Sequence, residues 1–194
     1  MNTIIVEGGK DMGNRIYPIG IQNFEKIRKE GYVYVDKTAL MYKLVKSGSY
    51  FFLSRPRRFG KSLLISTLEA YFEAKRDLFE GLAVETLEKD WVKRPVFHLD
   101  LNIGKYDTPD SLDKILNETL DYWESLYGTR SAETTLALRF AGVVGRAYEQ
   151  SGERVAILID EYDKPLLQAI GNEELQREFR NTLKPFYGVL KTMD

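Results

Sequence analysis

The sequence has no cysteine, and its single histidine is His98. Without cysteine the chain forms no disulfide, no thiolate metal site and no cysteine nucleophile. One histidine argues against a histidine-rich metal site and against histidine-based acid–base chemistry. Functions that depend on these two side chains are therefore not expected.

The sequence also lacks a large excess of one charge and a long apolar run. The chain carries 28 basic and 29 acidic residues, which gives a formal net charge of −1. No overall field therefore draws it to nucleic acid or to an anionic membrane, and any basic site must be local. No apolar run approaches the roughly 20 residues that a membrane helix requires, and residues 1–15 do not resemble a signal peptide. We expect a cytoplasmic protein.

The residues that are present have the composition of a folded globular protein. Hydrophobic residues make up 43% and charged residues 29% of the 194 positions, which is typical of a soluble domain. The length is sufficient for one domain with a sizeable core. No internal repeat or low-complexity tract interrupts it. We expect a loosely ordered segment at residues 1–15 and a single domain over residues 16–194.

Three short apolar runs are typical of strands buried on both faces of a parallel sheet. They cover residues 50–53, 96–101 and 155–159, and each is rich in β-branched or aromatic side chains. Helical periodicity is found at residues 23–29, 38–45, 61–72, 111–127, 134–148 and 173–191. Strands that alternate with helices predict an α/β fold with a mostly parallel sheet.

A candidate phosphate-binding loop follows the first predicted strand, at residues 54–62. It ends in Gly60-Lys61-Ser62, where a helix is predicted to begin, and strand–loop–helix is the context in which such a loop binds nucleotide. Backbone N–H groups and the helix dipole attract an anion to a helix N-terminus. Lys61 would reach the β- and γ-phosphates of ATP, and the Ser62 hydroxyl would hold Mg²⁺.

The loop departs from the general pattern at its start. Arg55 stands five positions before Gly60, where a glycine is usual, so the loop must begin with ordinary backbone angles. Arg55, Arg57 and Arg58 can add charge-assisted contacts to phosphate. Taken alone, the Gly-Lys-Ser tripeptide is explained equally well as a chance helix start beside a solvated arginine cluster.

A second motif, an acidic pair, ends the last predicted strand at Asp160-Glu161. Open α/β sheets bind ligands in the crevice outside the carboxyl ends of their strands. There Asp160 would hold Mg²⁺, mostly through water, and Glu161 would polarise the water that attacks the γ-phosphate. Surface carboxylates that cap a strand would explain this pair alone. Two half-motifs in the right order, each at the end of a predicted strand, favour a nucleotide site.

Other polar residues near these motifs are better explained as structural. Asp100, near the end of the second strand, is interpreted as a satisfied carboxylate, although it could face the same crevice. His98, inside that strand, is interpreted as a packed core histidine. Asp163 and Lys164 follow Glu161 closely, and we interpret them as a solvated turn before the proline at position 165.

Four blocks of the sequence, in order, carry a family resemblance. They are residues 18–24, 32–38, 54–62 and 158–163, and together they resemble the AAA-ATPase-like family of bacterial proteins. These proteins often carry a restriction-endonuclease-like domain after the ATPase domain. The arginine at position 55 is itself part of this family's phosphate loop. The resemblance implies a three-layer P-loop NTPase fold that binds ATP.

The resemblance also implies roles for particular residues. Lys61 and Glu161 would be catalytic, and Ser62 and Asp160 would hold Mg²⁺. It places the segment Asp36-Lys37-Thr38 beside the nucleotide, whereas the residues alone indicate a cap for the helix that follows. The residues expected to bind ATP are Arg55, Arg57, Arg58, Phe59, Gly60, Lys61, Ser62 and Leu63.

One departure from the family concerns the end of the chain. ATPases of this kind continue into a further strand with a polar sensor residue, which lies between the phosphate-loop strand and the acidic strand. Here residues 173–191 are followed only by Thr192, Met193 and Asp194. Either the chain is the N-terminal part of a longer protein or the sheet is built differently. Without the central strand, two buried strands would lack hydrogen-bonding partners.

We therefore expect a Mg²⁺-dependent ATP-binding domain, with hydrolysis of ATP to ADP and phosphate in the complete protein. A nucleotide-sensing module with little turnover and a scaffold that no longer binds nucleotide are the alternatives. The expected partners are ATP or ADP and a nuclease-like domain in the full protein; the net charge gives nucleic acid no support. Four candidates for an arginine finger remain equal: Arg139, Arg146, Arg177 and Arg180.

Overall fold

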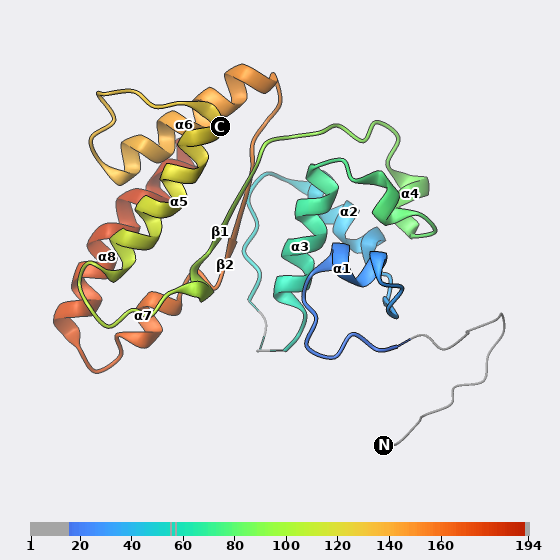
Figure 1. Ribbon diagram of the computed structural model, residues 1–194, viewed down its shortest axis with the longest axis horizontal. Coiled ribbons are helices and arrows are strands. Elements are labelled where there is room, and N and C mark those ends of the chain that lie inside the picture. The colour runs from blue at the N-terminus through green and yellow to red at the C-terminus, as the bar shows by residue number, and fades with distance from the viewer. Residues whose placement is uncertain (1–15, 55, 57, 193–194) are drawn as a thin grey trace.

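The computed structural model describes residues 16–54, 56 and 58–192. Two groups of helices lie on either side of a short sheet (Figure 1). The strands are β1 (Val96–Asp100) and β2 (Ala156–Asp160). The first group contains α1 (Phe24–Lys29), α2 (Thr38–Ser47), α3 (Lys61–Phe72) and α4 (Ala83–Leu87). The second group contains α5 (Ser111–Tyr127), α6 (Leu136–Ser151), α7 (Lys164–Gln168) and α8 (Glu173–Gly188). The short 3₁₀ helices are η1 (Arg76–Phe79), η2 (Leu101–Ile103) and η3 (Val189–Lys191).

The two strands run parallel, as predicted, and they pair in a register that aligns Asp100 with Asp160. Successive residues of a strand point to opposite faces of the sheet. Phe97 and Leu99 of β1 therefore pack into one hydrophobic cluster, whereas Val96 and Leu158 pack into another. Both faces of the sheet are covered, which explains why the sequences of these strands are continuously apolar. The predicted α/β class is confirmed.

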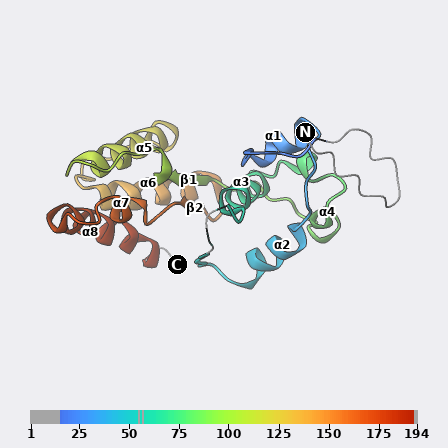
Figure 2. The same cartoon turned by 90° about the horizontal axis from the view of Figure 1, so that it is seen from below.

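The two clusters lie on opposite faces of the sheet, and Figure 2 shows α3 on one side and α5, α6 and α8 on the other. The cluster of the first helical group includes Phe24, Leu68 and Phe79. The cluster of the second group includes Trp123, Phe140 and Phe186, with ring pairs such as Phe140–Phe186 stacked at a centroid distance of 4.5 Å. Among the described residues, no helix is both long and apolar enough to cross a membrane.

The prediction of a strand at residues 50–53 is wrong. The sheet contains only β1 and β2 within the described residues. The four apolar side chains at positions 50–53 are exposed by 39–70%, and the segment has no regular secondary structure. A strand is stable only when its backbone groups pair with a neighbour, and no described segment pairs with this one to form a sheet. Residues 50–53 therefore have side chains typical of a strand but do not form one.

The longer helices agree closely with the predicted ranges. The segments predicted at residues 61–72 and 111–127 begin and end at the same residues as α3 and α5. The last segment divides into α8 and η3. The prediction missed the two five-residue helices α4 and α7, because one helical turn carries too little periodicity to be recognised. The interpretation of residues 163–164 as a turn is correct for Asp163, which is partly exposed in a turn, and wrong for Lys164, which begins α7 before the buried Pro165.

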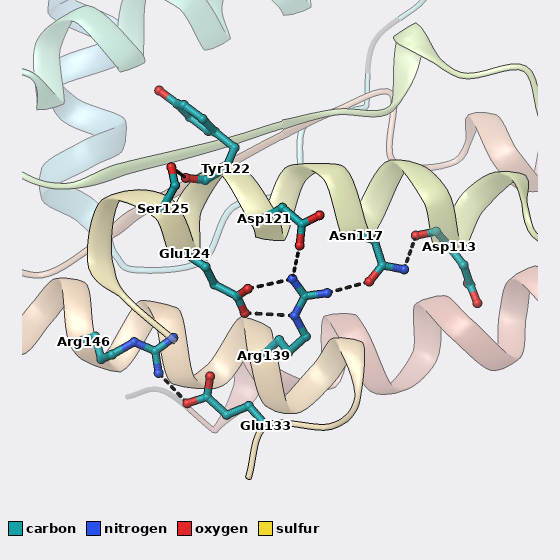
Figure 3. Close-up of polar contacts among 9 residues, drawn as sticks. All are labelled: Asp113, Asn117, Asp121, Tyr122, Glu124, Ser125, Glu133, Arg139 and Arg146. Atoms are coloured by element: carbon teal, nitrogen blue, oxygen red, sulfur yellow. Dashed lines mark hydrogen bonds and ion pairs between the residues drawn. The ribbon is translucent and has the colours of Figure 1, made fainter. Parts of the chain in front are cut away.

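Ion pairs connect α5 to α6. Figure 3 shows the Arg139 guanidinium of α6 between carboxylates and an amide of α5. It donates two hydrogen bonds to Glu124, at 2.9 and 2.7 Å, and further ones to Asp121 and Asn117. The Arg139 and Glu124 side chains are only 17% and 8% exposed. Glu124, which the chemistry of carboxylates would place at the surface, is buried because this fork–fork pair satisfies it.

A second pair joins Arg146 to Glu133, from the loop that precedes α6. Gly142 makes this approach possible, because a Cβ at that position would lie 1.9 Å from a Glu133 carboxylate oxygen. Arg139 and Arg146 are therefore committed to the helical core, which removes two of the four candidates for an arginine finger. Arg177 and Arg180 lie on the exposed side of α8.

We predict that Arg139→Ala lowers the free energy of unfolding by about 2–4 kcal/mol, because it leaves the buried Glu124 carboxylate without its partner. Urea denaturation followed by circular dichroism measures this change. Arg130→Ala is the matched control, since Arg130 and its partner Glu149 are 63% and 66% exposed; it should change stability by no more than about 0.5 kcal/mol. Equal effects of the two substitutions would contradict the assignment.

Candidate functional site

The predicted phosphate loop leads into α3 through two residues with left-handed backbone angles. Arg58 has φ 67°, and Gly60, the N-cap of α3, has φ 75° and ψ 26°. Apart from its immediate chain neighbours and its own helix, no atom of the described residues would lie within 4 Å of a Cβ at Gly60, so the backbone angle is the reason that glycine is favoured there. A left-handed residue followed by a helical one turns successive N–H groups toward one point, which is an anion-binding geometry.

The N-terminus of α3 is also free of the usual side-chain cap. Among the described residues no side-chain cap hydrogen bond is made at this end, and the first turn contains no acidic residue. The first N–H groups of a helix need acceptors, and an anion at this end supplies them. Lys61 opens the helix, although a cation is disfavoured there by the helix dipole. An anionic ligand at this position would satisfy both features.

Lys61 lies opposite the acidic pair that follows β2. Its Nζ is 3.7 Å from Oε1 of Glu161, and both side chains are 26% exposed. The structure thus brings together the two residues predicted to be catalytic, from positions 100 residues apart in the sequence. At this exposure the ion pair contributes little to stability. Both charged groups remain accessible to a ligand that enters from solvent.

Asp160 and Glu161 differ in their surroundings. Asp160, the last residue of β2, is 8% exposed, and its Oδ1 accepts a hydrogen bond of 3.0 Å from the backbone N–H of Glu161. Glu161 has φ 51°. A left-handed angle costs a residue other than glycine about 1–2 kcal/mol. Such strain is retained where neighbouring contacts hold it, often at functional positions.

Two further polar residues of β1 lie on the same face of the sheet as Asp160. Asp100 is aligned with Asp160 in the strand register, and its Oδ1 accepts a hydrogen bond of 2.8 Å from the backbone N–H of Asn102. His98 lies two residues earlier, with Nδ1 3.2 Å from a carboxylate oxygen of Glu69 on α3. The hydrogen bond to Glu69 raises the pKa of His98. The interpretation of His98 as a packed core residue is correct only in part: its side chain is 29% exposed, but its Nε2 is buried and has no hydrogen-bond partner among the described residues.

Several predicted ligand-binding residues lie around this point. Ser62 is the second residue of α3 and partly buried. Leu63 is partly buried and packs against the cluster of the first helical group. Phe59 is 63% exposed. Arg55 and Arg57 lie outside the described residues.

The segment from Asp36 to Thr38 is held by the polypeptide itself. Oδ1 of Asp36 accepts hydrogen bonds from the backbone and the hydroxyl of Thr38, and Oδ2 accepts one of 2.7 Å from the N–H of Ala83. Burial alone would raise the pKa of Asp36, but these hydrogen bonds outweigh it and the pKa is lowered. The Thr38 hydroxyl also accepts a hydrogen bond from Val84. This segment therefore joins α2 to α4, which accounts for its polar residues without a nucleotide.

Sequence reasoning missed the contacts that hold the turn after β2. The Lys164 Nζ donates hydrogen bonds to the backbone oxygen and to Oδ1 of Asn102. The ring of Tyr162 meets the ring of Phe52 edge-on, with centroids 5.0 Å apart. This contact places the segment that precedes the phosphate loop next to the end of β2. The only available signal was the position of Lys164 three residues after Glu161.

The residues present fit a magnesium ion that is shared with a phosphate ligand. In the described part of the chain, no three His, Cys, Asp or Glu side chains are arranged as a metal site. Mg²⁺ commonly has one or two carboxylates and substrate phosphates as ligands, and it does not need a cage made wholly of protein. The Ser62 hydroxyl and the Asp160 carboxylate are oxygen donors of the required kind.

Comparison with known sequences identifies the family. The model of a family described as "Predicted AAA-ATPase" matches residues 18–194. The chain therefore belongs to this family of predicted AAA-ATPases, and its membership supports nucleotide binding at a general level.

A relative from Azotobacter chroococcum mcd 1, described as an "Uncharacterized protein in vnfD 5'region", is 40% identical over 185 residues. The match covers 94% of this chain but 36% of the relative, so the chain spans about a third of that protein's length. No solved structure matches the chain.

The strained turn generates a stability prediction. Glu161→Gly and Glu161→Gln both remove the ion pair with Lys61, but only glycine relieves the left-handed angle. We expect Glu161→Gly to be more stable than Glu161→Gln by about 0.5–1 kcal/mol, measured by urea denaturation. The same two substitutions at Glu118, an exposed position inside α5, should give the opposite order by about 1 kcal/mol. The same order at both positions would refute the strain.

Proposed function

We propose that this chain is a Mg²⁺-dependent ATP-binding domain, and that the complete protein hydrolyses ATP to ADP and phosphate. The observation that carries the proposal is the meeting of Lys61, at the uncapped start of α3, with Glu161, at the end of β2, across 3.7 Å. Glu161 follows the buried Asp160 carboxylate directly. A cation, the N–H groups of a helix start and two neighbouring carboxylates of different exposure suit a phosphoanhydride better than an uncharged ligand.

Each residue has a role that follows from its position. The N–H groups at the start of α3 and the Lys61 ammonium would bind the β- and γ-phosphates. Ser62 and Asp160 would hold Mg²⁺, which when bound neutralises part of the phosphate charge. Glu161 is the more exposed carboxylate and would accept a hydrogen bond from a water molecule, which it orients toward the γ-phosphate. Phosphate that binds Lys61 takes the place of Glu161 as its partner, which frees the Glu161 carboxylate for this water.

The same ion pair favours a second candidate, a nucleotide-sensing module with little turnover. Lys61 and Glu161 neutralise one another in the nucleotide-free chain, so phosphate binding must separate them. This separation would change the contacts of the turn that joins β2 to α7. The candidates therefore share a binding site and differ in the rate of phosphate release.

The partner of this domain would lie in the rest of a longer polypeptide. The related Azotobacter protein extends well beyond the matched region, because the match covers only 36% of that protein's length. A nuclease-like domain is the partner that the family resemblance implies, and it stays a prediction. Sequencing downstream of codon 194 in the source genome tests whether such a domain follows.

The binding site is tested by Lys61→Ala. We expect it to weaken the binding of ATP with Mg²⁺ by roughly 10- to 100-fold, because it removes a charge-assisted contact to phosphate. Isothermal titration calorimetry measures both affinities. Lys105→Ala is the control, since Lys105 is 84% exposed and pairs with Asp107; this variant should bind ATP as tightly as the unchanged protein. Equal affinity of the Lys61→Ala variant would overturn the site.

Hydrolysis is tested by Glu161→Gln in the full-length protein. We expect phosphate release to fall by about 100-fold or more, because glutamine cannot act as the base that polarises water, while ATP binding is retained. A coupled phosphate-release assay gives the rate. Glu149→Gln, at a side chain that is 66% exposed, serves as control. If Glu161→Gln leaves the rate unchanged, the hydrolase proposal is wrong, and tight binding without turnover would support the sensing module.

A further inference from the structure

Glu161, in the turn after β2, has a strained backbone conformation that other contacts must hold. Glu161 has φ 51°, and a free peptide would relax to a right-handed or extended angle. The hydrogen bond from its own N–H to Asp160 spans one residue and moves with the turn. Contacts to elements outside the turn must therefore hold it.

One such contact comes from the start of α7. The backbone N–H of Lys164 donates to the backbone oxygen of Glu161 at 2.9 Å, so Lys164 closes the turn. Its side chain then extends to η2, where Nζ donates to the backbone oxygen of Asn102 and to Oδ1 of Asn102, the latter at 2.9 Å. A single residue thus fixes the turn after β2 to the loop after β1.

The chain of contacts continues to the sheet. The backbone N–H of Asn102 donates to Oδ1 of Asp100, the last residue of β1, at 2.8 Å. Asp100 is aligned with Asp160 in the parallel register. The carboxyl ends of the two strands are therefore joined twice, by the sheet itself and by the path from Asp100 through Asn102 to Lys164.

A second contact supports the turn from α8. The Tyr187 hydroxyl donates to the backbone oxygen of Tyr162 at 3.4 Å. Burial raises the pKa of Tyr187, so the hydroxyl keeps its proton and remains a donor. At 3.4 Å this bond is longer than the 2.9 Å contacts of Lys164. The ring of Phe52 also touches the turn, through Tyr162, but without a hydrogen bond to its backbone. We therefore assign the larger part of the restraint to Lys164.

We infer that Lys164 is a positioning residue: with Asn102 it forms a latch that holds the Glu161 carboxylate opposite Lys61. This inference rests on the role proposed above for Glu161. Lys164 acts through the backbone of the turn and touches neither phosphate nor Lys61. Its removal lets Glu161 relax and move its carboxylate, and misplacement of a catalytic group by about 1 Å can cost up to 100-fold in rate.

The latch is tested in the full-length protein with Lys164→Met, which keeps the aliphatic stem and removes the donor. We expect kcat for ATP hydrolysis to fall about tenfold, with the affinity for ATP and Mg²⁺ changed by less than about twofold, since Lys61 and the start of α3 are untouched. Asn102→Ala removes only one of the two acceptors and should have a smaller effect. The double variant should be no slower than Lys164→Met alone.

Two control variants distinguish a positioning role of Lys164 from a general role in holding α7 against its neighbours. Gln168 lies at the other end of α7 and accepts a hydrogen bond of 2.9 Å from the N–H of Tyr106. Gln168→Ala loosens the same helix without reaching Glu161, so kcat should be unchanged. In a Glu161→Gln background, Lys164→Met should lower the remaining rate by less than about twofold, because the group that it positions is already gone.

The outcomes distinguish the two proposals. Hydrolysis that depends on Glu161 but not on Lys164 overturns the latch and leaves the proposed function standing. Equal loss of kcat in Lys164→Met and Gln168→Ala, or an undiminished effect of Lys164→Met in the Glu161→Gln background, also overturns it. Absence of Glu161-dependent hydrolysis in the unchanged protein overturns the proposed hydrolase and the latch together.

Discussion

The parallel pairing of β1 with β2 is the interaction on which the rest of the structure depends. Its register aligns Asp100 with Asp160, so the last residues of both strands end at one edge. Alternation along the same strands sends Phe97 into one cluster and Leu158 into the other. The pairing therefore decides which helices cover each face and also where the polar side chains gather.

Two residues at this edge contradict the local preferences of their elements. Lys61 carries a positive charge at a helix N-terminus, and Glu161 has a left-handed backbone angle. Each choice is unfavourable alone, and the two side chains meet at 3.7 Å. Two unfavourable local choices that meet at one point in space indicate that these residues were selected for function and not for stability. The favourable helices and the stacked aromatic rings elsewhere offset these small losses.

The sequence predicted what local pattern and burial determine. Apolar residues spaced by one helical turn gave α3 and α5 their limits, and the buried runs gave β1 and β2 within one residue. Residues 50–53 have the same apolar character, but a strand also needs a partner, and chemistry alone cannot supply one. The site followed a similar division. Lys61 and Glu161 were found from motifs, whereas the contact between Lys164 and Asn102 depends on how η2 and α7 meet, which has no sequence signature.

The two hydrophobic clusters have a thermodynamic consequence. They lie on opposite faces of two five-residue strands, so each of the described halves has a core of its own. Units joined in this way can open at different free energies, and amide exchange then resolves them as separate cooperative blocks. Lys61 belongs to the half that contains α3, and Glu161 to the turn that leads into the other half. A molecule held between them would couple the two blocks, and the cooperativity of unfolding would report its presence.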